Sequence, residues 1–395
     1  MPLKPSEILA ILNQKKGEFS SFNQDLSAQL ALYRQAVKTL SRESFADLKQ
    51  TLANKTSPGA RPLEGDKPWP DWIQSVQLSW PSRQASLAWV RDRLQDVTTF
   101  SVDGSQIFPS KDLSIPVGLV QIGWFENPHS TEGRYTKDVR VAVLSPMELQ
   151  QNAQNRPLDR LVNMHRFAME VQRHIEFMEA NQGHQDCITF FDGSLVGSFA
   201  EVLDLDCRNF YAQEFVRLLR TSEQCRVPLV GYVDTSNARD LVSMVAGIAP
   251  LPESEAIKDV QILNSNRMQW GDRTPLFICD RAGAARTQGI LSQYQEQSQS
   301  VAFTYMKLNA NRLVRLELPK WIHEDELLET VLNYVRSEVI IGSGYPYVIE
   351  TADQVAVLRT EDRQMFYRIL QDWSAEQDLD LQFSRKMVSK AFRRR

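Results

Sequence analysis

Apolar residues recur at helical spacing in the first part of the chain. The pattern runs from Ser6 to about Leu52 and predicts a helical segment. A narrower apolar seam within it alternates steps of four and three residues: Leu26, Leu30, Tyr33, Val37 and Leu40. This seam can pack on the body of the same chain or on a partner. The residues Lys55 to Pro81, rich in proline and tryptophan, predict an irregular connection.

Stretches of β-prone residues dominate from Thr98 onward. The first expected strands are Thr98 to Val102, Ile115 to Phe125 and Arg140 to Leu144. A helix is expected from Leu158 to Ala180, followed by a strand, a helix and a strand at Cys187 to Phe191, Asn209 to Cys225 and Pro228 to Val233. Later strands are expected at Leu276 to Cys279, Val301 to Tyr305 and Leu313 to Leu318, with helices after His323 and from Ile349 to Leu358.

The order of these elements predicts an α/β fold. Three strands in succession suggest an antiparallel meander, whereas strands separated by helices pair in parallel. We therefore expect a mixed β-sheet flanked by helices, with an N-terminal helical extension. The expected domains are residues 1–90, which hold the helical segment and the connection, and residues 91–395, which hold the sheet. Functional sites in such sheets gather at the strand ends.

Composition narrows the class of protein. The 395 residues are 42% hydrophobic and 24% charged, as in folded globular proteins. No stretch is long and apolar enough to cross a bilayer, and no secretion signal begins the chain, so a cytoplasmic protein without a membrane partner is expected. The four scattered cysteines predict buried thiols. The net charge of -4 means that any contact with nucleic acid must be local.

Two Asp-Gly-Ser sequences carry the strongest chemical signal. Asp103 and Asp192 each begin one of them, directly after a β-rich run. A single Asp-Gly is usually a tight turn, but its repetition after two strands favours carboxylates brought together on neighbouring strands. Paired carboxylates without nearby His or Cys prefer Mg²⁺ or Mn²⁺, and two such ions would support phosphodiester hydrolysis.

Two further acids are needed to complete such a site, and the sequence leaves alternatives for both. Glu170 and Glu176 each flank the apolar stripe of the helix between the two aspartates. Asp353 and Glu350 both lie near the start of a late helix. Most helix carboxylates are simply solvated, so the choice within each pair depends on geometry.

The sequence lacks the motifs of several other enzyme classes. There is no phosphate loop of ATPases, no dinucleotide-binding glycine turn and no zinc-peptidase histidine spacing. Arg239 and Arg281 follow strands and could contact phosphate, although arginines in such places also form structural ion pairs. The other candidate substrate contacts are Ser105, Ser194 and Tyr345.

Four short segments, taken in order, resemble the NurA family of DNA-repair nucleases. They are Phe100 to Ser105, Phe190 to Leu195, Gly231 to Leu241 and Gly344 to Tyr347. The resemblance implies an RNase H-like core and a divalent-metal site, usually most active with Mn²⁺. It also implies degradation of single-stranded and duplex DNA, including 5′ to 3′ exonuclease action, by a homodimer that works with the hexameric HerA ATPase at double-strand breaks.

The resemblance also assigns roles to individual residues. Asp103 and Asp192 match the metal-binding aspartates of the family, and Glu170 matches its helix glutamate. Tyr345 matches a late tyrosine, but Asp353 stands where relatives commonly have histidine. A carboxylate binds Mg²⁺ or Mn²⁺ at least as well as imidazole does, so Asp353 is expected to be the fourth ligand.

The expected function is therefore metal-dependent DNA cleavage, as exonuclease and single-strand endonuclease. Two alternatives remain open. The same site could cleave RNA or an RNA–DNA hybrid, because its chemistry does not require one sugar. The chain could also be a catalytically silent adaptor of a DNA motor ATPase, which its acidic charge and N-terminal seam would suit.

Overall fold

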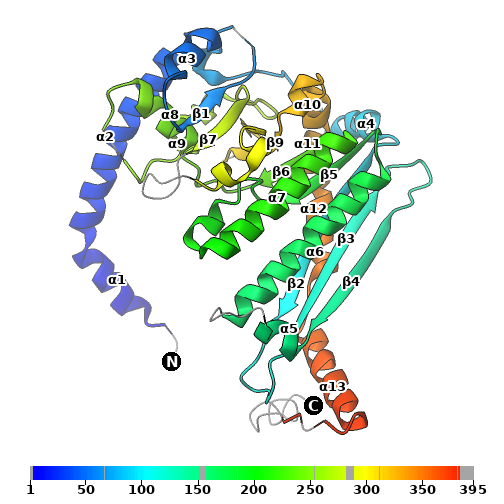
Figure 1. Ribbon diagram of the computed structural model, residues 1–395. Helices are drawn as coiled ribbons and strands as arrows, with labels where there is room; N and C mark the ends of the chain where they lie inside the picture. The colour runs from blue at the N-terminus through cyan, green and yellow to red at the C-terminus, as the bar shows by residue number, and fades with distance from the viewer. Residues whose placement is uncertain are drawn as a thin grey trace. The chain divides into compact units, whose positions relative to one another are not determined.

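The computed structural model describes residues 3–65, 67–151, 157–184, 186–252, 254–281, 289–310, 312–379 and 381–382 (Figure 1). Their contacts divide the chain into two compact units. Unit 1 comprises residues 1–79, 233–288 and 301–316, and unit 2 comprises residues 80–232, 289–300 and 317–395. Both units are discontinuous in sequence, unlike the continuous domains 1–90 and 91–395 expected above.

Unit 2 contains the expected meander and parallel strands. Its strands are β2 (Thr98–Ile107), β3 (Gly118–Asn127), β4 (Thr136–Leu144), β5 (Cys187–Asp192) and β6 (Leu229–Val233). They lie in the order β6-β5-β2-β3-β4. β2, β3 and β4 pair antiparallel, while β5 is parallel to both β2 and β6. The predicted mixed α/β fold is confirmed, and it is consistent with the expected nuclease core.

Helices cover both faces of the unit 2 sheet. The helices of unit 2 are α4 (Arg83–Leu94), α5 (Pro146–Gln151), α6 (Leu158–Ala180), α7 (Leu205–Cys225), α10 (Trp321–Glu324), α11 (Leu328–Ile341), α12 (Tyr347–Ala356) and α13 (Thr360–Glu376). Trp124 of β3 lies under Arg173 of α6, and the next residue, Phe125, packs edge-on against Tyr347 of α12. Because neighbouring residues of a strand face opposite sides, α6 and α12 cover opposite faces.

β2 is longer than its sequence predicts. It was expected to end at Val102, but it continues to Ile107, so Asp103 lies inside a strand and not at a turn. β3 supplies hydrogen-bonding partners along this whole length, from Thr99 to Ile107, and this pairing keeps the chain extended. β5 does end at Asp192, where Gly193 adopts a φ of 131° that favours glycine.

Unit 1 contains the remaining strands and the N-terminal helices. Its strands are β1 (Pro58–Pro62), β7 (Phe277–Arg281), β8 (Val301–Met306) and β9 (Val314–Pro319), whose last residues belong to unit 2, in the order β1-β7-β8-β9. Its helices are α1 (Pro5–Gln14), α2 (Lys16–Leu40), α3 (Phe45–Leu52), α8 (Asp240–Ile248) and α9 (Asp259–Ile262). The expected irregular connection thus contains β1, which forms because β7 pairs with it antiparallel.

The apolar seam of α2 packs within unit 1. Tyr33, Val37 and Leu40 are buried, and the Tyr33 hydroxyl donates a hydrogen bond to the Pro252 carbonyl at 2.9 Å. In contrast to α2, helix α1 at the start of the predicted helical segment has no buried residue. Within the described residues no helix is long and apolar enough to cross a membrane. All four cysteines are buried thiols, as expected.

His174 anchors α6 to the sheet. Its Nδ1 lies 2.7 Å from the Thr189 hydroxyl of β5, and its ring packs against Phe100 and Phe191. Burial, together with the nearby charge of Arg173, lowers the pKa of His174 to about 3. Its Nε2 is buried without a hydrogen-bond partner among the described residues. A proton on this nitrogen would have no acceptor, which disfavours the charged form of the ring.

His174 is expected to make the protein less stable in mild acid. The unfolded chain binds a proton at this residue below its usual pKa of about 6.5, whereas the folded chain does not until about pH 3. The free energy of unfolding should therefore fall by about 2 kcal/mol between pH 7.5 and 5 through this group alone. Urea unfolding of the parent and of His174→Phe at both pH values would measure it. If the parent and His174→Phe lost the same free energy of unfolding between the two pH values, His174 would not be the cause of the loss.

Candidate active site

The two aspartates meet because their strands are neighbours. β2 and β5 are parallel, with Ser101 opposite Phe190, and Asp103 and Asp192 each lie two residues further along. The Ser101 hydroxyl donates a hydrogen bond to the Phe190 carbonyl at 2.9 Å, which holds this register just before the acids. The structure thus brings together the acids of both Asp-Gly-Ser sequences.

Asp353 reaches this point from α12, which approaches β3 closely at Gly123. Gly123 is paired with Asp103, and a Cβ atom there would lie 2.6 Å from the Ala356 nitrogen and 2.8 Å from its Cα. The end of α12 is fixed by Gln121, whose side chain donates to the Ala356 carbonyl at 3.0 Å. The side chains of Asp353 and Asp103 are consequently in hydrogen-bonding contact.

Glu170 approaches from α6 on the opposite face. It is buried, and its Oε1 accepts a hydrogen bond from Arg166 Nη1 at 2.5 Å. Gly104 makes room for both side chains, because a Cβ atom there would overlap Glu170 Oε1 and lie 2.8 Å from Arg166 Cγ. Glycine beside Asp103 therefore leaves space for two helix side chains, and it does not form a turn.

The four acids form one electrostatic site. Burial, a hydrogen bond to Asp353 and the negative charges of Asp353 and Asp192 raise the pKa of Asp103 to about 6, against the lowering effect of the Gly104 amide. Burial and the charges of Asp103 and Asp192 likewise raise the pKa of Glu170 to about 7, although Arg166 opposes this. Such crowding of carboxylates is the arrangement that a cation relieves.

The competing acids of the sequence lie in different surroundings. Glu176 forms a two-pronged ion pair with Arg140, at 2.9 Å for both contacts, and is partly exposed. Glu350 and Asp353 are both exposed on α12, but Asp353 is the acid that interacts with Asp103. Geometry therefore favours Glu170 and Asp353 over their rivals.

The donor chemistry of this site fits a hard divalent cation. All four side chains offer carboxylate oxygens, the ligands that Mg²⁺ and Mn²⁺ prefer. In the described part of the chain, however, no three His, Cys, Asp or Glu side chains are already gathered as a ligand cage. Asp103 is engaged with Asp353, and Glu170 with Arg166, so binding a cation would require these side chains to change partners.

Three other candidate residues support the acids or the loops beside them. The Tyr345 hydroxyl donates to Asp192 Oδ1 at 2.9 Å, and its ring packs edge-on against Tyr232 at 5.1 Å. The Ser105 hydroxyl accepts a hydrogen bond from the Leu358 amide at 3.3 Å, just beyond α12. Ser194 donates to Glu317 at 2.8 Å. Each serine therefore already has a structural partner close to the acids.

Arg239 and Arg281 belong to unit 1 and have internal partners. Arg239 Nε donates to the Ile257 carbonyl at 3.1 Å. Arg281 forms a two-pronged pair with Asp240, at 2.9 and 2.7 Å. The structure thus gives Arg281 an ion-pair partner and Arg239 backbone carbonyl partners, and their contact with phosphate stays a prediction.

Two residues that matter to this geometry were not singled out from the sequence. Arg166 lies four residues before Glu170, the spacing at which helix side chains of opposite charge pair. Gly123 interrupts a β-rich run, and an isolated glycine in a strand often marks a close backbone approach. Both signals were present, but neither identifies which distant side chain or helix would be the partner.

The sequence matches the NurA domain over residues 97–358, which is more than half of the chain. The match begins at the start of β2 and ends just after α12, so it contains all four acids. No curated protein matches the chain.

Proposed function

The chain belongs to the NurA family of nucleases, and from this premise we propose that it hydrolyses DNA with divalent ions, Mn²⁺ or Mg²⁺, held by its four clustered acids. The single observation that carries the proposal is the convergence of Asp103, Asp192, Asp353 and Glu170 from two strands and two helices. An acidic cluster of this kind is unfavourable by itself, and metal binding is what makes it useful.

The side chains of the site have different proposed roles. Asp103 lies at the centre, in contact with Asp353 and close to Asp192, and would hold a divalent cation together with them. Tyr345 holds Asp192 in orientation, and Arg166 neutralises Glu170 until a cation does so. Two bound ions would supply an activated water and stabilise the departing oxygen of the phosphodiester.

The finer substrate and partner assignments extend the same proposal. We propose single-stranded DNA and duplex ends as substrates, with 5′ to 3′ exonuclease and single-strand endonuclease action in double-strand break repair. A homodimer working in the cytoplasm with a HerA-type hexameric ATPase would suit a chain of net charge -4, since the motor would contribute much of the hold on DNA.

Metal removal is expected to abolish cleavage. Purified protein with end-labelled single-stranded and duplex DNA should cleave both in Mn²⁺, lose all activity in EDTA, and recover when Mn²⁺ is restored, because water activation depends on the ions. Matched RNA and RNA–DNA hybrids belong in the same experiment. Cleavage that persists in EDTA, or cleavage confined to RNA, would overturn the proposal. Absence of cleavage with the ATPase present would favour the silent adaptor.

A further inference from the structure

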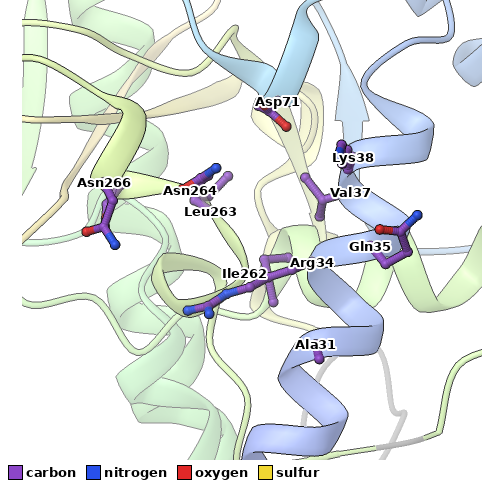
Figure 2. A pocket seen from close by; sticks show the side chains of 11 residues that line it. Ala31, Arg34, Gln35, Val37, Lys38, Asp71, Ile262, Leu263, Asn264 and Asn266 are labelled. Carbon is purple, nitrogen blue, oxygen red and sulfur yellow. The ribbon is translucent and has the colours of Figure 1, made fainter.

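A cavity of about 260 Å³ with both polar and apolar lining lies within unit 1, and no acid of the catalytic cluster contributes to it. Figure 2 shows that its wall is built from one side of α2, the segment 262–266 and Asp71. The residues on α2 are the outward neighbours of the buried seam: Val37 belongs to both, while Arg34 and Lys38 are exposed. The cavity therefore arises where α2 packs on its own unit.

Two cations face this cavity without an acidic partner. Arg34 and Lys38 lie one helical turn apart, and neither forms an ion pair with a described residue. Like charges at this spacing destabilise a helix by a few tenths of a kcal/mol, so their pairing has no benefit for α2 itself. Arg34 Nε donates to the Gln261 carbonyl at 2.9 Å, which orients its guanidinium on the cavity wall.

The rest of the lining does not cancel this positive charge. Among the described residues that line it, the only acid is Asp71, whose carboxylate is already paired with Arg267. The other polar groups are neutral side chains that can donate hydrogen bonds: Gln35, Asn264, Ser265 and Asn266. Figure 2 shows Asn264 and Asn266 on the segment that stands across from Gln35 and Lys38. The cavity thus combines two unneutralised cations with neutral donors, which suits an anion with several oxygens.

We propose that this cavity binds a phosphodiester group of a nucleic-acid strand. Arginine pairs with phosphate through two parallel hydrogen bonds, and lysine contributes a point charge. No aromatic side chain is among the described residues that line the cavity, so it offers no surface on which a base could stack. The contact is therefore to the backbone and independent of base sequence.

The inference rests on the proposed function for its ligand, and it explains how an acidic nuclease holds DNA. A chain of net charge -4 cannot rely on overall electrostatic attraction. A local phosphate contact on α2 would supply affinity without placing cations beside the catalytic acids. It would also give the N-terminal helices a role in binding substrate.

The experiment measures binding separately from cleavage. Fluorescence anisotropy with a labelled single-stranded oligonucleotide in EDTA should show that Arg34→Gln combined with Lys38→Gln weakens binding about tenfold at low salt. The slope of log affinity against log salt should become shallower by about 0.7 to 1.4, for one or two phosphates no longer neutralised. Both substituted side chains are exposed, and a thermal melt of each variant verifies folding.

The matched control removes the same charge elsewhere on the N-terminal helices. Lys15→Gln combined with Lys16→Gln changes two exposed lysines that do not line the cavity, and its affinity should stay within about twofold of the parent. Equal weakening by both double variants would show a general charge effect and overturn the inference. Parent-like binding by the cavity variant would also overturn it.

The two proposals can fail independently. If the parent cleaves DNA in Mn²⁺ while the cavity variant binds like the parent, the cavity inference is wrong and the proposed function stands. If the parent binds DNA through the cavity but never cleaves it, the proposed function is wrong and the cavity inference stands. If the cavity variant loses only association with the motor ATPase, the cavity recognises an acidic protein surface and the inference is overturned.

Discussion

Asp103→Asn and Asp192→Asn are each expected to lower metal-dependent DNA cleavage at least about a hundredfold. Asparagine keeps the shape of the side chain but removes the charge that holds a divalent ion. Losing even part of the several kcal/mol that metal catalysis supplies has this effect, because about 1.4 kcal/mol corresponds to a factor of ten. Initial rates with end-labelled single strands in Mn²⁺ would measure it.

Folding should not be the cause of that loss. Asp103 carries a pKa of about 6 because it is partly buried and lies beside Asp353 and Asp192, so a neutral side chain removes unfavourable interactions. The melting temperature of Asp103→Asn without metal should therefore equal or exceed that of the parent. If the variant is inactive but also clearly less stable than the parent, unfolding would explain the loss of cleavage. That result would contradict this prediction.

The two glutamates of α6 provide a matched comparison. Glu170→Gln should reduce cleavage strongly, since Glu170 is buried beside Gly104 and interacts with both aspartates. Glu176→Gln should leave cleavage within about twofold, because it removes only a partly exposed pair with Arg140. If Glu176→Gln lost cleavage and Glu170→Gln kept it, Glu176 would be the metal ligand on α6, and the assignment of Glu170 would be wrong.

Gly123→Ala is expected to destabilise the protein by about 1 to 3 kcal/mol and to reduce cleavage as well. The added Cβ would lie 2.6 Å from the backbone nitrogen of Ala356, so β3 or α12 must move. Movement of α12 withdraws Asp353 from Asp103, which couples packing to the chemistry. Urea unfolding and the cleavage assay together measure both effects.

Gly17→Ala is the control for that substitution. It makes the same chemical change inside α2, where a Cβ atom meets nothing within 4 Å. Alanine is a better helix former than glycine, so stability should stay the same or rise by up to about 1 kcal/mol. If Gly123→Ala were as stable and active as Gly17→Ala, close packing of α12 on β3 would not be what positions Asp353.

Local periodicity determined most of the unit 2 elements. The bounds of α6 agree with the prediction, Leu158 to Ala180, because an apolar stripe at helical spacing depends only on nearby residues. The meander and the buried strand before Asp192 were likewise visible in the alternation and β-propensity of short stretches. The paired Asp-Gly-Ser sequences identified two of the clustered acids before any geometry was known.

The positions of Glu170 and Asp353 beside the aspartates depend on tertiary contacts. β2 passes beyond Asp103 because β3 pairs with it, and Gly104 leaves room for the Glu170 side chain that arrives from α6. Asp353 joins the aspartates only because α12 can approach Gly123. These contacts connect residues far apart in sequence, and their energy depends on packing and burial, which no local pattern contains. Residue patterns therefore predicted the two strand acids, the family resemblance predicted Glu170 and Asp353, and only the packing of α6 and α12 shows how these two helix acids come close to the aspartates.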